Sequence, residues 1–161
     1  MKNWVGVVLG AALAAALLAG GAPTSMAAGR QTEKAGTTKA NKEKPLYFRL
    51  GGKTAIAKVV DDFVGHVAAD TRINRFFAHT DIPHLKMELV NQICEAAGGP
   101  CKYTGKSMKE AHQGMGISTA DFNALVEDLV WALDQNKVGE KEKNELLAVL
   151  GPMKSDIVEK P

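Results

Sequence analysis

The sequence lacks the marks of several common classes of protein. Its 161 residues carry a formal net charge of only +2, and no basic stripe alternates with aromatic residues, so a nucleic-acid partner is not expected. Only two cysteines and four histidines are present, without a zinc-ligand spacing or a Cys-x-x-Cys-His motif for covalent cofactor attachment. No segment alternates with a period of two, and no internal repeat is found. The rest of the composition, 45% hydrophobic and 24% charged, is ordinary for one compact domain.

The first 27 residues have the pattern of a secretory signal peptide. Lys2 precedes an apolar run that reaches Leu18, and the small-x-small site Ser25-Met26-Ala27 precedes a polar stretch. We expect cleavage after Ala27 and export, to a bacterial periplasm, with no stable membrane anchor left on the mature protein. The alternative is an uncleaved anchor, since about 18 apolar residues can just span a bilayer.

Residues 28–44 differ from what precedes and follows them. They are rich in Gly, Thr, Ala, Lys and Glu and have no hydrophobic period, which predicts a flexible linker. The periodic pattern begins at Pro45, so residues 45–159 form the predicted folded domain.

Every well-patterned segment of that domain has helical spacing. Gly51-Gly52 marks a sharp corner before the first long helix. The second long helix is expected to start at Thr80 or Asp81. Pro83 then falls in its first turn, where a missing N–H costs nothing, and Gly98-Gly99-Pro100 ends it. The first long apolar stripe, spaced by three and four residues, consists of Ile56, Val59, Val60, Phe63, Val64 and Val67.

Two capping boxes and a proline shape the second half of the domain. Ser107 to Glu110 opens a short helix, and Ser118 to Asp121 opens a longer one. The last helix is expected over residues 140–158, with a kink at Pro152. The predicted fold class is therefore all-α.

His112 is the candidate metal ligand. It lies on the short helix, one turn after Met108. A neutral imidazole in an apolar setting is a good iron ligand when its other nitrogen donates to a backbone carbonyl, and the carbonyl of Met108 is the expected acceptor. A lone histidine beside a glycine turn is more often a surface or core residue, so this residue alone does not decide the matter.

An ordered series of motifs surrounds His112 along the chain. In order, the motifs are Leu46-Tyr47-Phe48-Arg49-Leu50-Gly51-Gly52, Asp62-Phe63, Phe76-Phe77, Gly98-Gly99-Pro100, Tyr103-Thr104-Gly105 and Met108 through His112 to Gly116-Ile117. This series resembles the group 1 truncated haemoglobins from Pro45 to Val158. The resemblance implies a truncated globin fold, two helices packed over two around a non-covalent haem b. It also implies that His112 is the proximal ligand to the iron and that Phe77 packs on the haem face.

The distal side, opposite His112, departs from the family pattern. The family commonly has tyrosine where this chain has Val64, and often glutamine where it has Leu89. The residues expected to face a bound gas, which also include Phe63 and Leu85, are therefore all apolar. Gln92 lies on the same helical face and is the one obvious polar side chain that could reach in.

Other polar residues near the predicted site have weaker claims. Lys86 and Tyr103 resemble positions that can meet the haem propionates, and a surface lysine and a packed tyrosine fit the pattern equally well. His66 should point away from the haem, because it lies about 200° around its helix from Val64. His79 and His84 fall in or beside the loop before the distal helix and are expected to be solvated; the alternative is that one of them is a sixth ligand to the iron.

Cys94 and Cys101 flank the glycine turn that ends the second long helix. In an oxidising compartment they could form a disulfide, which would pin this helix to the loop that leads to His112. The alternative is two small buried thiols.

Together these features predict a haem protein that binds diatomic gases (O2, NO and CO). A distal hydrogen-bond donor to bound oxygen is worth roughly 1.5–3 kcal/mol, so an apolar distal side predicts weak discrimination in favour of oxygen and a readily oxidised iron. One alternative is a haem enzyme, a nitric oxide dioxygenase or a peroxidase-like protein, which would need an electron donor of unknown identity. A second alternative is a haem-free helical interaction module.

Overall fold

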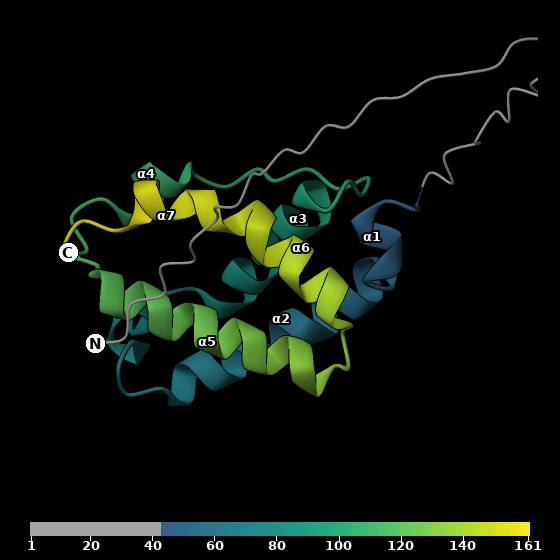
Figure 1. Cartoon of the computed structure of the whole chain (residues 1–161). Coiled ribbons are helices and arrows are strands. Elements are labelled where there is room, and N and C mark those ends of the chain that lie inside the picture. Colours follow the sequence, from purple (N-terminus) through teal and green to yellow (C-terminus); the bar gives the residue numbers. More distant parts are fainter. Residues whose placement is uncertain (1–42) are drawn as a thin grey trace, which may run out of the picture. The chain divides into compact units, whose positions relative to one another are not determined.

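The computed structural model describes residues 43–161 (Figure 1). The predicted signal peptide and all but the last two residues of the predicted linker lie outside the described residues. Within the described part the regular elements are helices, together with one isolated bridge between Ser118 and Lys160. None of the helices between residues 43 and 161 is both long and apolar enough to cross a membrane. In chain order the helices are α1 (Leu46–Arg49), α2 (Gly52–Ala69), η1 (Asn74–Phe77), α3 (Ile82–Ala96), α4 (Met108–His112), α5 (Thr119–Gln135), α6 (Glu140–Leu150), η2 (Gly151–Met153) and α7 (Lys154–Ile157).

The ends of the helices follow the local chemistry of the sequence. Gly51 and Gly52 have φ values of 94° and 76°, which turn the chain sharply between α1 and α2 and are accessible to glycine at little cost. Asp81 caps α3, since its side chain accepts a hydrogen bond from the backbone N–H of His84. The boxes headed by Ser107 and Ser118 are both formed, each with reciprocal hydrogen bonds.

Helix α2 is the centre of the packing. It lies against α3 on one side and α5 on another, and all six residues of its predicted apolar stripe are buried. The most deeply buried side chains around it come from four other segments and include Ile73, Cys94, Leu133 and Leu146. Because α2 shares its apolar face among several partners, the space beside it is bounded by helices that are far apart in sequence.

The last predicted helix is present with its irregularity at the proline. Helix α6 ends at Leu150, η2 contains Pro152, and α7 follows directly as a single turn, with αR dihedrals at Leu150, Gly151, Met153 and Lys154. Proline has no N–H to donate and its ring crowds the carbonyl one turn earlier, which explains the tightened turn at the predicted kink. After α7 the chain runs beside the segment before α5. Glu159 N and Lys160 N donate to the Ile117 carbonyl, at 2.8 and 3.1 Å, and Thr119 N donates to the Lys160 carbonyl at 3.0 Å.

Candidate cofactor site

A cavity of about 360 Å³ lies between α2, η1, α3, α4, α5 and the segment from Leu150 to Ile157. Its walls are overwhelmingly apolar, and its volume is in the range of about 300–1,000 Å³ typical of cofactor and small-molecule sites. The predicted site residues that line it are Phe63, Val64, Phe77, Leu85, Leu89, Gln92, Tyr103, Met108 and His112.

His112 is the only histidine that lines this cavity among the described residues. Its Nδ1 atom lies 2.7 Å from the backbone oxygen of Met108, one helical turn earlier. A carbonyl oxygen can only accept, so Nδ1 carries a proton in this contact, and in the neutral imidazole Nε2 then keeps its lone pair. The side chain is therefore held in the tautomer that can bind a metal through Nε2.

Gln92 brings a polar group to the cavity, and its amide nitrogen is directed at two sulfur atoms. Nε2 lies 3.3 Å from Met108 Sδ and 3.6 Å from Met153 Sδ. Thioether sulfur is a weak acceptor, so these contacts orient the amide without binding it tightly. In this arrangement the amide nitrogen points to Met108 of α4, the helix of His112, and to Met153 of η2.

Lys86 and Tyr103, the two candidates for contact with propionates, differ in their positions. Lys86 does not line the cavity; its Nζ pairs with Asp61 Oδ1 at 3.0 Å, because a carboxylate on α2 lies within its reach. Tyr103 lines the cavity, but its hydroxyl donates to the Lys106 carbonyl at 2.6 Å. Burial, and then the charge of Glu88, raise the pKa of Tyr103 above its ordinary value.

Several lining residues were missed at the level of sequence. Glu88 is buried on the cavity wall, and Met115, Met153 and Ile157 also line it. The signal for Glu88 was present, since it lies three residues after Leu85 on the same helical face. The helical spacing places Met153 and Ile157 on the apolar face of the last helix, but the sequence does not show that this face lines the cavity.

A seam of contacts ties the second half of α3 to the loop that leads to α4. Cys94 and Cys101 form a disulfide, and Glu95 Oε2 accepts the backbone N–H of Tyr103 at 2.9 Å while Oε1 pairs with Lys102. These contacts, that with Lys102 first, lower the pKa of Glu95. Two turns toward the start of α3, Glu88 accepts hydrogen bonds from the backbone N–H and the hydroxyl of Thr104, at 3.2 and 3.1 Å. The loop is thus fixed to α3 at three successive points before α4 begins.

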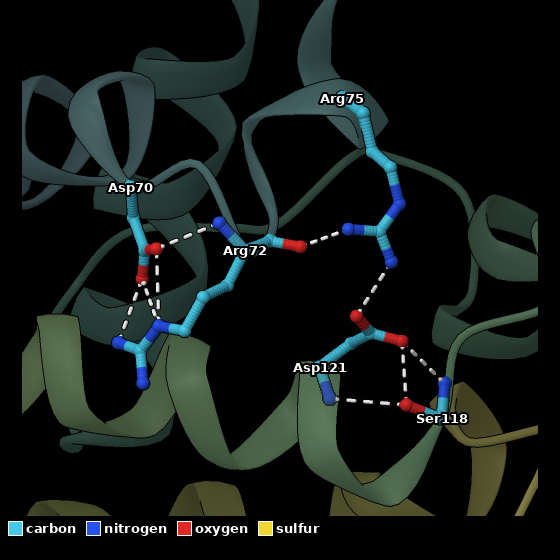
Figure 2. Close-up of polar contacts among 5 residues, drawn as sticks. All are labelled: Asp70, Arg72, Arg75, Ser118 and Asp121. Atoms are coloured by element: carbon cyan, nitrogen blue, oxygen red, sulfur yellow. Dashed lines mark hydrogen bonds and ion pairs between the residues drawn. The ribbon is translucent and has the colours of Figure 1, made fainter.

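A second polar cluster joins η1 to the start of α5, next to Phe76 and Phe122 of the cavity wall (Figure 2). The Arg75 guanidinium pairs with Asp121 Oδ1 at 2.7 Å and also bonds the Arg72 carbonyl. The other carboxylate oxygen of Asp121 accepts from the Ser118 hydroxyl and backbone N–H, at 2.6 and 2.9 Å. The bonds from Ser118, and then Arg75, lower the pKa of Asp121 from its ordinary 3.8 to about 2.

The remaining histidines lie away from the cavity lining. His79 and His84 are exposed. The His66 ring stacks on Trp131 with centroids 4.0 Å apart, and its Nε2 lies 3.5 Å from Asp128 Oδ1. Asp128 is 2% exposed, and burial raises the pKa of its carboxyl.

The loop after His112 is held by a residue from the end of the described chain. The backbone N–H groups of Gly114 and Gly116 donate to the two carboxylate oxygens of Glu159, at 2.6 and 2.5 Å. These two bonds, in that order, lower the pKa of Glu159. Figure 1 shows α4 and α7 side by side, in agreement with their direct packing.

An all-helical domain with one histidine on a large apolar cavity is the arrangement of a haem protein of the globin class. Comparisons with known proteins identify the family within this class. Residues 45–159 match the family described as bacterial-like globin. A group 1 truncated hemoglobin from Tetrahymena pyriformis is 34% identical over 120 residues, 74% of this chain and 99% of that protein. The group 1 truncated hemoglobin GlbN of Mycolicibacterium paratuberculosis is 36% identical over 112 residues, covering 70% and 82%.

Solved structures show the same likeness. The Fe(III) form of the Tetrahymena pyriformis truncated hemoglobin superposes with a TM-score of 0.68 at 34% identity, covering 70% of this chain and 97% of that one. The 2/2 hemoglobin from Synechococcus sp. PCC 7002, in the cyanomet state with covalently attached heme, gives 0.67 at 33% identity, covering 71% and 98%. The chain belongs to the bacterial-like globin family, as a group 1 truncated haemoglobin. The predicted all-α, two-over-two globin fold is thereby confirmed, and haem is the cofactor that the family implies.

Proposed function

We propose that this chain is an exported haem b globin that binds diatomic gases at an iron held by His112. The observation that carries the proposal is the hydrogen bond between His112 Nδ1 and the Met108 carbonyl, because it reserves Nε2 of the neutral imidazole for a metal on the wall of an apolar cavity. Haem would supply the iron that takes up the gas. The residues of the chain would orient that iron, cover the porphyrin with apolar side chains such as Phe77 and exclude water.

The haem is proposed to be held without a covalent bond. Thioether attachment needs free thiols, and Cys94 and Cys101 are bonded to one another. A link through a second histidine would need that histidine on the cavity wall, and in residues 43–161 only His112 lines it. This feature would distinguish the chain from the Synechococcus relative, which was solved with covalently attached heme.

The distal side is proposed to be apolar, formed by Phe63, Val64, Leu85 and Leu89. These side chains can neither donate a hydrogen bond to a gas nor accept one, and the amide of Gln92 is directed at sulfur atoms. A missing donor to a partly charged ligand costs roughly 1.5–3 kcal/mol, so oxygen should dissociate faster by an order of magnitude or more. Carbon monoxide and nitric oxide are less polarised and should be affected less.

Export is proposed from residues 1–27, whose pattern is that of a signal peptide. The protein would then meet its gases outside the cytoplasm. Mass spectrometry of the protein recovered from the periplasm tests this, since cleavage after Ala27 predicts a mature chain that begins at Ala28. Recovery of the uncleaved chain in the membrane fraction would contradict it.

Titration of the haem-free protein with hemin tests the cofactor and its ligand. A Soret band should develop with one equivalent of hemin, and His112→Ala should shift or lose it. His84→Ala, an exposed histidine away from the cavity lining, is the matched control and should leave the band unchanged. A wild-type protein that stays colourless with hemin, or an unchanged spectrum in His112→Ala, would contradict the proposal.

Gas binding and turnover can be separated with the loaded protein. Stopped-flow mixing of the oxygenated protein with nitric oxide, followed by addition of a reductant, measures whether nitric oxide is consumed over many cycles. We expect a single turnover at most, because the apolar distal side does not hold oxygen for long. Sustained consumption would instead favour the nitric oxide dioxygenase reaction.

A further inference from the structure

The helix that carries His112 is too short to hold its own end in place. Helix α4 spans only Met108–His112, and isolated helices below about 12–15 residues are marginal in water. Its beginning is fixed by the capping box of Ser107 and by the seam to α3. Its end passes into a loop with two glycines at positive φ, Gly114 at 80° and Gly116 at 67°, so a restraint from elsewhere must fix that side.

Glu159 supplies this restraint. Its two carboxylate oxygens accept the N–H groups of Gly114 and Gly116 separately, at 2.6 and 2.5 Å. The positive φ values turn both N–H groups toward the same carboxylate. Bonds to a charged acceptor are about twice as strong as neutral ones, so one side chain fixes two points of the loop.

The residue between these two points belongs to the cavity. Met115 lines it, and its backbone N–H donates to the His112 carbonyl at 3.1 Å. Holding Gly114 and Gly116 therefore fixes Met115 against the cavity and fixes the carbonyl end of α4.

The segment that carries Glu159 is itself anchored. Its backbone pairs with Ile117 and Thr119 through three hydrogen bonds, and α7, directly before it, packs against α4. The carboxylate is thus presented from a fixed backbone to the loop beside His112. On the basis of the proposed role of His112, we infer that Glu159 is a positioning residue for the iron ligand, which acts by clamping Gly114 and Gly116 on either side of Met115.

The clamp can be tested first without haem, on the full chain. Amide hydrogen exchange of Gly114 and Gly116, measured by NMR at pH 7, should be roughly ten-fold faster in Glu159→Ala than in the wild type. Glu159→Gln keeps one acceptor oxygen and should fall between them. The matched control is Asp156→Asn, an exposed carboxylate on α7, which should leave both rates unchanged.

The hemin-loaded protein tests the effect on His112. Transfer of haem to apomyoglobin should be roughly ten-fold faster in Glu159→Ala, with a smaller increase in Glu159→Gln. The iron–histidine stretching band of the ferrous form, recorded by resonance Raman, should shift or broaden in both variants. Val60→Ala, at a fully buried core position outside the cavity lining, serves as the control for lost stability and should leave this band unchanged.

Two results would overturn the inference. One is that Gly114 and Gly116 exchange at wild-type rates in Glu159→Ala, which would show that Glu159 does not restrain the loop. The other is faster exchange in Glu159→Ala together with a wild-type rate of haem loss and an unchanged stretching band. This would show that Glu159 holds the loop but does not position His112. Failure of the wild type to take up hemin contradicts the proposed function instead, and the exchange measurement still decides whether the clamp exists.

Discussion

Reduction of the Cys94–Cys101 disulfide should lower the free energy of unfolding by about 2.5 kcal/mol at 25 °C. The two cysteines are seven positions apart, and in the chain-entropy description a closed loop of about eight residues restricts the unfolded chain by this amount. For a domain of roughly 115 residues, this loss corresponds to a melting temperature about 10 °C lower. The native contacts of the loop with Glu88 and Glu95 remain, so the fold itself should be retained.

The measurement is thermal unfolding of the haem-free protein followed by far-UV circular dichroism, with and without a phosphine reductant. A variant that lacks the disulfide, Cys94→Ala with Cys101→Ser, provides the comparison. Alanine suits position 94, which is fully buried, and serine suits position 101, which is partly exposed. This variant should melt near the reduced wild type and should not respond to the reductant.

A melting temperature of the fully reduced wild type within about 2 °C of the oxidised protein would refute this reasoning. Thiol titration in denaturant must show complete reduction. An unchanged melting temperature would mean that the carboxylate contacts of Glu88 and Glu95 alone stabilise the seam between α3 and the loop.

Three further predictions concern the core, the pH response and the distal side. Leu133→Ala, at a side chain 1% exposed, should cost about 2–5 kcal/mol in urea unfolding, and a loss below 1 kcal/mol would contradict its assignment to a tightly packed core. The pKa of Asp121 is lower in the folded protein, about 2, than its ordinary 3.8, so its stabilisation is present above about pH 4 and is lost as the pH falls toward 2. Asp121→Asn should remove this part of the acid response, and identical acid unfolding curves would count against it. Leu89→Gln adds a hydrogen-bond donor on the distal side, so oxygen dissociation should become slower by roughly ten-fold or more. Carbon monoxide dissociation should change little. Flash photolysis and stopped-flow mixing measure both rates.

The parts of the structure that depend on neighbouring residues could be predicted from the sequence. The apolar stripe of α2 is buried as its spacing indicates, and the boxes at Ser107 and Ser118 are formed. The contact between His112 and the Met108 carbonyl is of the same kind, since it spans a single helical turn. Each of these features follows from helical geometry alone.

The parts that depend on docking could not be predicted. Arg75 binds Asp121 from 46 positions away, and Glu159 binds Gly114 from 45 positions away. The capping box predicts the bonds between Asp121 and Ser118, but no local pattern predicts either of these long-range contacts. For Lys86 a contact with the haem and a surface position fit the sequence equally well; it pairs with Asp61, because α2 places a carboxylate within its reach. The last helix and the irregularity at Pro152 could be predicted, but not that Met153 lines the cavity, because this depends on how the helix docks.

The pairing of Glu159 and Lys160 with the loop beside His112 has a consequence for the timing of assembly. A ribosome adds Glu159 45 positions after Gly114, so this contact cannot form until nearly the whole domain has been synthesised. Long-range closures of this kind form late in folding, because the entropy of joining distant segments must be met first. On the inferred role of Glu159, firm retention of haem would therefore begin only after Glu159 and Lys160 have docked.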